Sequence, residues 1–276
     1  MKKTTLLLLS ALAFLQANAQ KLPGIQTVSV KAPANVKIDG KATEWNNKFE
    51  ADNATTELLY TIANDDKKLY LVAQTKVENV MTRITNGGIK LIVQKSGKKN
   101  DDGGAVVKFP YLENGTKPVT FNLSGMTLVV GRTDRGMTLE AVRLNPATPA
   151  DAERMADSLM KLNNKKLQGV AKLIYTEGIA GINGAIPVYN DKGIEAAVAF
   201  DNKKNYTYEI AIDLKLLGLS AAKGEKFSYH LVVNGTPNKY QPETTPYLEN
   251  TSAGFQKDYA MRIATTDLWG EYTLAK

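Results

Sequence analysis

The sequence predicts a mainly β protein whose strands pack as two antiparallel sheets. Apolar and polar residues alternate with a period of two over most of the chain, and each alternating run has the length of one strand. Turn-forming residues, mainly Asn, Asp and Gly, bound these runs. Short strands separated by such turns favour an antiparallel β-sandwich of immunoglobulin-like or jelly-roll-like architecture, in which the apolar side of each strand faces the other sheet.

Six alternating runs define the predicted strands, because neighbouring side chains of a strand point to opposite faces of a sheet. They cover residues 58–62, 69–73, 89–93, 194–200, 206–212 and 227–233. A repeated tetrapeptide, GMTL at Gly125 and again at Gly136, flanks a short polar turn and predicts the two arms of one further hairpin. A short helical turn is expected at 214–219, ending near Gly218.

One amphipathic helix is predicted in the middle of the chain. Thr148 can cap it, Pro149 suits its first position, and Asp151 can complete a capping box. Apolar residues then recur at helical spacing, namely Ala152, Met155, Leu159 and Leu162. We expect this helix to cover one edge or one end of the sandwich, which would protect unpaired strand groups.

Residues 1–19 form a predicted signal peptide. Lys2 and Lys3 precede an apolar run at 6–15, and Ala17-Asn18-Ala19 supplies a cleavage pattern that places the cut before Gln20. We therefore expect an exported protein, in the periplasm, at the cell surface or outside the cell, with no membrane-spanning helix. No linker-like stretch interrupts 20–276, which predicts one β-sandwich domain with an insertion around 77–204.

Composition excludes several classes of site. The chain has no cysteine, so it forms no disulfides and no thiolate metal sites, and the packing of its core must hold the exported fold together. The net charge is +7, but the surplus lies in Lys-Lys pairs at turn-like positions rather than along one stripe. That distribution does not indicate nucleic-acid binding. It is compatible with weak attraction to an acidic glycan or envelope surface.

Catalytic motifs are sparse, and we expect no enzyme activity. His230 is the only histidine, and it alternates with Phe227, Tyr229 and Leu231, so we interpret it as a structural or surface residue. No G-x-S-x-G motif is present. The pentapeptide PYLEN occurs twice and supplies one carboxylate pair for glycoside hydrolysis, but loop acids are usually solvated.

We expect no cofactor. The Asn100-Asp101-Asp102-Gly103 turn offers oxygen atoms that suit Ca²⁺, which leaves a structural calcium ion as an alternative. The spacing does not fit a calcium-binding loop, so the turn is interpreted as a plain connection.

The loops carry the predicted ligand-binding residues. A connection of more than twenty residues, around 234–257, holds aromatic residues among Asn, Gln, Thr and Glu. Aromatic faces beside amide and carboxylate groups suit sugar rings, but also an ordinary packed loop or a contact with a protein. The candidate ligand-binding residues are Tyr111, Glu113, Asn114, Tyr240, Tyr247, Glu249, Asn250 and Trp269.

The stretch VKIDGKATEWN, at 36–46, is interpreted as structural. Val36 and Ile38 read as the last inward residues of an early strand, and the Asp39-Gly40 pair as the turn that reverses it. We expect Trp45 to fold over the end of the sandwich as a buried plug rather than to form a ligand platform.

Several short motifs recur in a characteristic order, namely IDG and EW within 38–45, AND at 63–65 with KLYLVA at 68–73, YEIAIDL at 208–214 with LGL at 217–219, the strand 227–234, and DLWG with YTL at 267–274. In this order they resemble the family 9 carbohydrate-binding modules and the wider DOMON-like group of β-sandwiches. Asp213 stands where the group usually has proline, and 77–204 has no counterpart.

The resemblance implies a β-sandwich that binds sugar, although its sugar-binding members use two exposed tryptophans and only Trp269 remains available here. Other members of the group bind haem through Met with His or Lys, and His230 shows no such pairing in the sequence. The leading hypothesis is therefore an exported, non-catalytic protein that recognises a carbohydrate or an envelope glycan through loop aromatic residues. The alternatives are a protein-interaction or structural subunit of an envelope assembly, a haem carrier and, with least support, a hydrolase.

Overall fold

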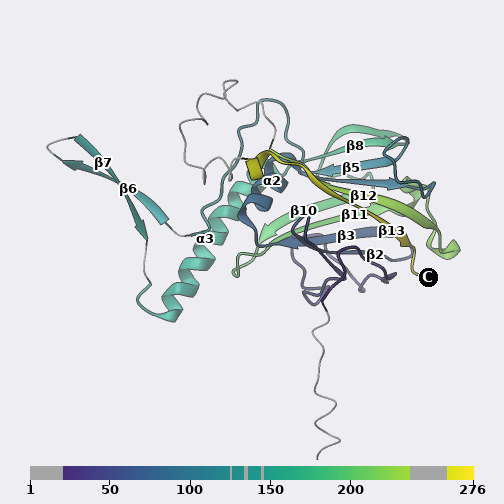
Figure 1. Cartoon of the computed structure of the whole chain (residues 1–276), viewed down its shortest axis with the longest axis horizontal. Coiled ribbons are helices and arrows are strands. Elements are labelled where there is room, and N and C mark those ends of the chain that lie inside the picture. Colours follow the sequence, from purple (N-terminus) through teal and green to yellow (C-terminus); the bar gives the residue numbers. More distant parts are fainter. Residues whose placement is uncertain (1–20, 125, 134–135, 144–145, 237–259) are drawn as a thin grey trace, which may run out of the picture.

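A computed structural model of the protein describes residues 21–124, 126–133, 136–143, 146–236 and 260–276, without the side chains of 126–133 and 136–143. Two antiparallel sheets face each other as a sandwich, which confirms the predicted fold class (Figure 1). The five-stranded sheet has the order β1 (Ala51–Asn53), β2 (Leu58–Asn64), β3 (Lys68–Thr75), β11 (Tyr206–Asp213) and β10 (Ile194–Phe200). The six-stranded sheet has the order β13 (Thr266–Thr273), β12 (Lys226–Val233), β4 (Ile89–Gln94), β5 (Ala105–Phe109), β8 (Leu173–Ile179) and β9 (Ile182–Pro187).

All six predicted strands are present, because their alternating apolar residues form the core between the sheets. The largest fully buried rings are those of Tyr60, Tyr206, Tyr208, Tyr229, Phe109 and Phe227. The predicted hairpin is also confirmed, as β6 (Met126–Thr133) pairs with β7 (Gly136–Arg143). The short helical turn is Leu214–Leu217, and Gly218 ends it with a left-handed backbone.

The segment 21–50 covers the outer face of the five-stranded sheet and forms a second apolar cluster there (Figure 1). Trp45 and Phe49 are both buried and share this cluster with Tyr70 and Val72. The interpretation of Trp45 as a core residue is thus confirmed. Its expected place was wrong, because it covers the face of a sheet rather than the end of the sandwich.

The early strand expected at 36–38 is not formed. Val36 and Ile38 instead pack as partly buried residues onto the second apolar cluster. The Asp39-Gly40 bend turns its backbone N–H groups toward a side chain of β11 rather than toward a partner strand. The alternation of apolar residues in this segment therefore reflects packing against the face of a sheet, and the segment does not pair with another strand.

Helix α2 (Glu78–Gly87) fills one end of the sandwich and was not predicted. Val80, Met81 and Ile84 join the main core. Polar neighbours, including Arg83 and Thr85, are buried as well, so burial extends beyond the apolar side of the helix.

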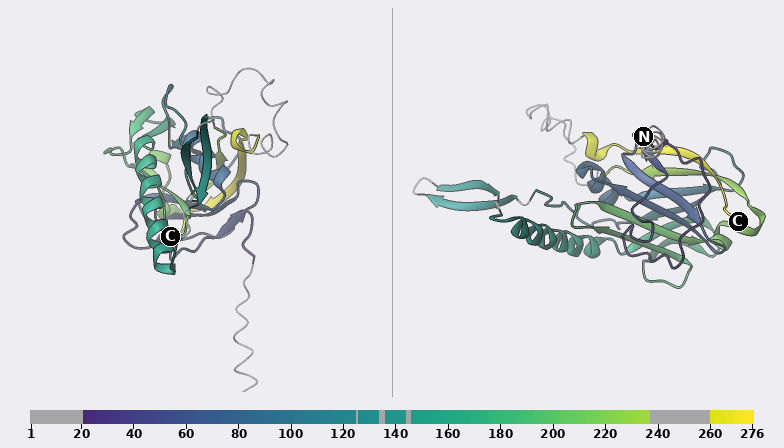
Figure 2. Two further views of the ribbon diagram at one scale, coloured as in Figure 1. Left: turned by 90° about the vertical axis from the view of Figure 1, so that its left-hand side faces the viewer. Right: turned by 90° about the horizontal axis from the view of Figure 1, so that it is seen from below.

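The predicted amphipathic helix is α3 (Pro149–Val170). Thr148 caps it as expected, accepting a hydrogen bond from the backbone N–H of Asp151 at 3.1 Å. The predicted apolar stripe was wrong in part, because Leu162 is 52% exposed and the buried residues are Met160, Asn163 and Leu167. The helix lies beside β10, an edge strand, while the β6–β7 hairpin stands clear of the sandwich (Figures 1 and 2).

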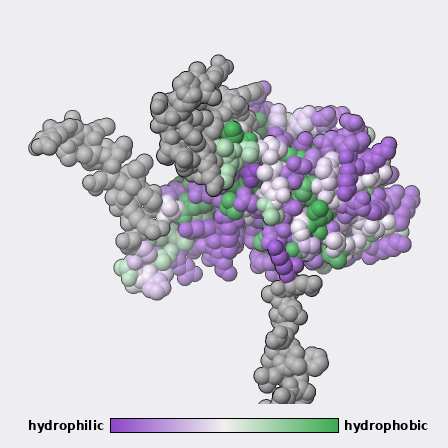
Figure 3. Space-filling model, in the orientation of Figure 1, coloured by the Kyte–Doolittle hydropathy of each residue, from purple (hydrophilic) through white to green (hydrophobic). Residues whose placement is uncertain are grey.

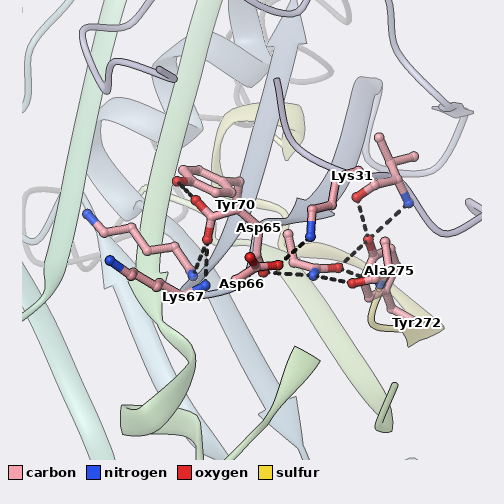
Figure 4. Close-up of polar contacts among 10 residues, drawn as sticks. Lys31, Asp65, Asp66, Lys67, Tyr70, Tyr272 and Ala275 are labelled. Atoms are coloured by element: carbon pink, nitrogen blue, oxygen red, sulfur yellow. Dashed lines mark hydrogen bonds and ion pairs between the residues drawn. The ribbon is translucent and has the colours of Figure 1, made fainter. Parts of the chain in front are cut away.

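The buried side chain of Asn64 joins the β2–β3 turn to Tyr272 and Ala275 near the C-terminus, the two residues labelled at this junction in Figure 4. Its amide group donates to the carbonyl oxygen of Ala275 at 2.9 Å, and its Oδ1 accepts from the Tyr272 hydroxyl at 3.1 Å and from the Ala275 N–H at 2.7 Å. The same hydroxyl lies 2.9 Å from the carbonyl oxygen of Val30, so its single proton is shared between Val30 and Asn64, and it accepts the N–H of Val30 at 3.1 Å. This network ties the covering N-terminal segment to both sheets. No helix among the described residues is long and apolar enough to cross a membrane.

Candidate functional site

The two outer faces of the sandwich differ. The segment 21–50 covers that of the five-stranded sheet, whereas no described helix or strand lies over that of the six-stranded sheet (Figure 1). The loop 95–104 folds onto part of this second face, where its Gly97 and Asp101 bond Ser228 and His230. We call the outward side chains of β13, β12, β4, β5 and β8 the open face. The strand register arranges them in rows, of which one contains Trp269, His230, Ile92, Val106 and Glu177, and the next contains Asp267, Val232, Lys90, Lys108 and Tyr175.

Trp269 lies flat against His230 at one edge of the open face. The two ring centroids are 4.2 Å apart and the ring planes differ by 13°. The imidazole is held on both sides, with Nδ1 2.8 Å from Asp101 and Nε2 2.9 Å from Asp267. Because ionised carboxylates only accept hydrogen bonds, both contacts are hydrogen bonds when both ring nitrogens carry protons.

This arrangement bears on the expected role of His230. The side chain is 13% exposed, and both of its nitrogens are already occupied by carboxylates. A general base must instead reach the proton of a nucleophile or a substrate. The histidine therefore positions the ring of Trp269, in keeping with its interpretation as a structural residue.

A second aromatic pair lies toward the other side of the open face. The ring centroids of Tyr111 and Tyr175 are 5.2 Å apart, and the planes differ by 34°. Tyr111 follows β5, and its N–H donates to the carbonyl oxygen of Leu173 at 2.9 Å, which fixes its backbone beside β8. The Tyr175 hydroxyl lies 3.4 Å from the Glu177 carboxylate, and the charge of that carboxylate is the main cause of a raised Tyr175 pKa.

Two lysines stand between these aromatic pairs. Lys90 on β4 lies directly opposite Lys108 on β5. The stem of Lys108 passes over Gly88, where a Cβ atom would come within 3.0 Å of its Cε. Its ammonium group then lies 5.8 Å from the centroid of the Tyr111 ring.

The structure brings two of the predicted residues onto this one face. Trp269 lies on β13, and Tyr111 stacks on Tyr175 four strands away, a span of about 19 Å at the usual strand spacing. Glu113 and Asn114 are exposed in the loop that follows Tyr111. The other predicted residues, Tyr240, Tyr247, Glu249 and Asn250, lie outside the described residues.

Sequence reasoning missed Tyr175, Lys90 and Lys108. Each is an outward member of a strand, a position at which polar and aromatic residues are ordinary. Only the register of β4, β5 and β8 shows that they are neighbours. The pairing of Lys90 with Lys108 has no local signal in the sequence.

Among the clefts of the described residues, two lie beside Trp269 and beside Tyr189. One of about 390 Å³ runs between 25–29 and β13, and Trp269 forms part of its wall. The other, of about 540 Å³, lies along the edge strand β10, and its mixed apolar and polar lining includes Phe109, Val198, Gln168, Tyr189 and Glu195. Tyr189 is 95% exposed, the most exposed of the large hydrophobic residues in the described part of the chain.

No metal site emerges within the described ranges, where no three acidic or histidine side chains gather closely enough to hold an ion. The predicted alternative, a calcium ion at the 100–103 turn, would need Asp101. That carboxylate lies against His230, so the turn acts as a support for the Trp269 and His230 stack.

Comparison with known proteins gives this chain no assigned family. No protein-family model matches it, and a search of curated proteins found no significant similarity.

Proposed function

We propose that this chain is an exported, non-catalytic binding protein that holds a carbohydrate or an envelope glycan against its open face. The observation that carries the proposal is the pair of aromatic platforms, Trp269 on His230 and Tyr111 on Tyr175, which lie on one face over which no described helix or strand packs. Aromatic rings pack against the C–H groups of sugars, while polar side chains between them satisfy hydroxyl groups.

The spacing of the platforms supports a polymeric ligand. At about 19 Å apart, they cannot both contact one sugar ring, but a chain of several rings laid across the strands reaches both. The resemblance to family 9 carbohydrate-binding modules supports the same ligand class, although the paired tryptophans of those modules are replaced here by one tryptophan and two tyrosines.

Glycan-affinity electrophoresis with purified protein tests this proposal. We expect retention by at least one polysaccharide, and a loss of affinity of about tenfold or more in Trp269→Ala and Tyr175→Ala, since buried aromatic anchors dominate binding energy. Tyr189→Ala is the matched control, because it removes an exposed tyrosine from another surface. The proposal fails if no polysaccharide retains the protein, or if Tyr175→Ala and Tyr189→Ala behave alike.

A second candidate function, a protein-interaction subunit, is favoured by the β10 edge. Asn164 of α3 bonds the outward backbone groups of Phe200 on this edge strand, but the cleft beside the strand combines Val188, Ala196 and Val198 with the exposed ring of Tyr189. The side of the sandwich seen in Figure 3 is largely hydrophilic, with apolar residues only in small separate groups, which gives no support to a large apolar docking patch there. Co-purification from the native envelope that Tyr189→Ala abolishes, and that sugar competition leaves unchanged, would favour this function.

A further inference from the structure

The lysines of the open face differ from the other described lysines. Nearly all of the latter are exposed, as expected of a long charged side chain. Lys68, Lys90 and Lys108 are the ones in the described ranges that are half-buried. Lys68 has a carboxylate partner in Glu195. Within the same ranges, neither Lys90 nor Lys108 has an acidic side chain within ion-pair distance.

Their arrangement costs free energy in the unliganded protein. Like charges directly opposite each other on neighbouring strands destabilise a sheet. Burial lowers the pKa of Lys108, and the positive charge of Lys90 lowers it further. A fold that needed only to be stable would place a carboxylate or a neutral residue at one of these positions.

The geometry also restricts Lys108. Its stem is held over Gly88, and its ammonium group faces the ring of Tyr111 instead of extending into solvent. Binding therefore orders less of the side chain than it would for an exposed lysine, so an anion meets a site that is already organised.

We propose that the ligand of the open face is an acidic glycan, with a carboxylate or sulfate group seated between Lys90 and Lys108 and a sugar ring against Tyr111 and Tyr175. The inference rests on the proposed function and adds the charge of the ligand to it. An acidic group with several oxygen atoms accepts hydrogen bonds from two ammonium groups at once, which removes their mutual repulsion.

Two acidic residues near Lys90 and Lys108 disfavour two other kinds of anionic partner, a lipid surface and a nucleic-acid strand. Asp267 lies in the same row of the open face, and Glu177 follows Tyr175 on β8. A lipid surface or a nucleic-acid strand would press closely spaced negative charges against these carboxylates. A glycan with an acidic group on some of its rings places its charge at the lysines and neutral hydroxyl groups beside the carboxylates.

Matched pairs of polymers test the inference by calorimetry or affinity electrophoresis. The pairs are polygalacturonate with its carboxyl-reduced form, and dextran sulfate with dextran. We expect the wild-type protein to bind at least one acidic polymer about tenfold more tightly than its neutral form, with an affinity that falls as salt rises. Lys90→Gln and Lys108→Gln should each remove most of that preference.

Two further variants keep the test specific. Lys37→Gln removes the same charge from the exposed cover of the five-stranded sheet and should leave binding unchanged. Lys108→Met keeps an apolar stem over Gly88, so it separates the loss of charge from the loss of packing and should bind as weakly as Lys108→Gln.

Each outcome decides between the two proposals. Tight binding of a neutral glycan that Lys90→Gln and Lys108→Gln leave unchanged overturns the acidic ligand and keeps the glycan-binding function. If Lys37→Gln weakens binding of the acidic polymer as much as Lys90→Gln and Lys108→Gln do, the net charge of the protein alone attracts the polymer, and the proposed site is wrong. Binding to phosphatidylglycerol-containing vesicles through the two lysines, without binding to either acidic polymer, overturns the glycan. Failure of every polymer to bind overturns both proposals.

Discussion

The carboxylate of Glu209 on β11 accepts a hydrogen bond from the indole N–H of Trp45 at 3.1 Å. Its other oxygen accepts the backbone N–H groups of Asp39 and Gly40, at 3.1 and 2.9 Å. One buried side chain of the five-stranded sheet thus holds both the bend and the tryptophan of the N-terminal cover. The cover is therefore held by polar contacts as well as by the apolar cluster to which Trp45 belongs.

This contact predicts that stability depends on pH. Burial raises the pKa of Glu209 from 4.5 to about 7, although the three N–H donors favour the ionised form and offset part of the shift. Because the folded-state pKa lies above the unfolded one, the contribution of Glu209 is fully present below pH 4.5 and is lost as pH rises through about 7. The free energy of unfolding should fall by up to about 3 kcal/mol across this window.

Urea unfolding of the wild type and of Glu209→Gln, from pH 4.5 to 8, measures this effect. Taking the difference between the two proteins removes the titration of all other groups. We expect the wild type to lose stability relative to Glu209→Gln as pH rises. A difference that stays flat, or that grows with pH, would show that Glu209 is ionised throughout the range.

We expect substitutions of Trp45 to lower the free energy of unfolding strongly and to leave glycan binding unchanged. Trp45→Phe keeps an aromatic ring but leaves a carboxylate oxygen of Glu209 without its donor, at a cost of about 1–2 kcal/mol. Trp45→Ala also empties the space beside Tyr70 and should cost about 3–5 kcal/mol. Chemical unfolding measures both costs. A change in glycan affinity, with the fold retained, would contradict the assignment of Trp45 to the core.

The hydrogen bonds of the Asn64 side chain predict that its removal destabilises the protein at the contact between the β2–β3 turn and the C-terminal residues (Figure 4). Asn64→Ala leaves the N–H and the carbonyl oxygen of Ala275 without this partner, while the Tyr272 hydroxyl keeps its contacts with Val30, so we expect a loss of about 2–3 kcal/mol in unfolding free energy. Asp66→Ala is the matched control nearby, because its ion pair with Lys31 is exposed and should contribute less than about 0.5 kcal/mol. Similar losses in the two variants would mean that the amide network adds nothing.

Much of this fold could be predicted because alternation is a local property. The strands from Leu58 to Val233 and the cap at Thr148 depend on residues a few positions apart. Helix α2 could not be predicted, since its burial at one end of the sandwich depends on the sheets around it and allows Arg83 and Thr85 inside. The cover at 36–38 has the alternation of a strand but packs on a sheet face instead of pairing.

The candidate site was less predictable, for a related physical reason. Trp269 and Tyr111 could be named because aromatic residues among polar neighbours are conspicuous along the chain. Their place on one face, and the Lys90 and Lys108 pair between them, depend on which strands pair and in which register. Strand pairing between distant segments is set by the whole fold, so local sequence does not report it.

The lysine pair predicts opposite effects on stability and on binding. Removing one of two opposed positive charges relieves repulsion, so Lys90→Gln and Lys108→Gln should leave the free energy of unfolding unchanged or raise it by about 0.2–1 kcal/mol. Residues kept for function commonly lower stability in this way.

The measurement is urea unfolding at low salt and again at high salt, where screening should reduce any gain in the free energy of unfolding. Lys68→Gln is the control, because it breaks the ion pair with Glu195 and should not stabilise the protein. If Lys90→Gln and Lys108→Gln instead destabilise the fold at both salt concentrations, the two side chains serve packing, and the open face loses the main reason to expect an acidic ligand.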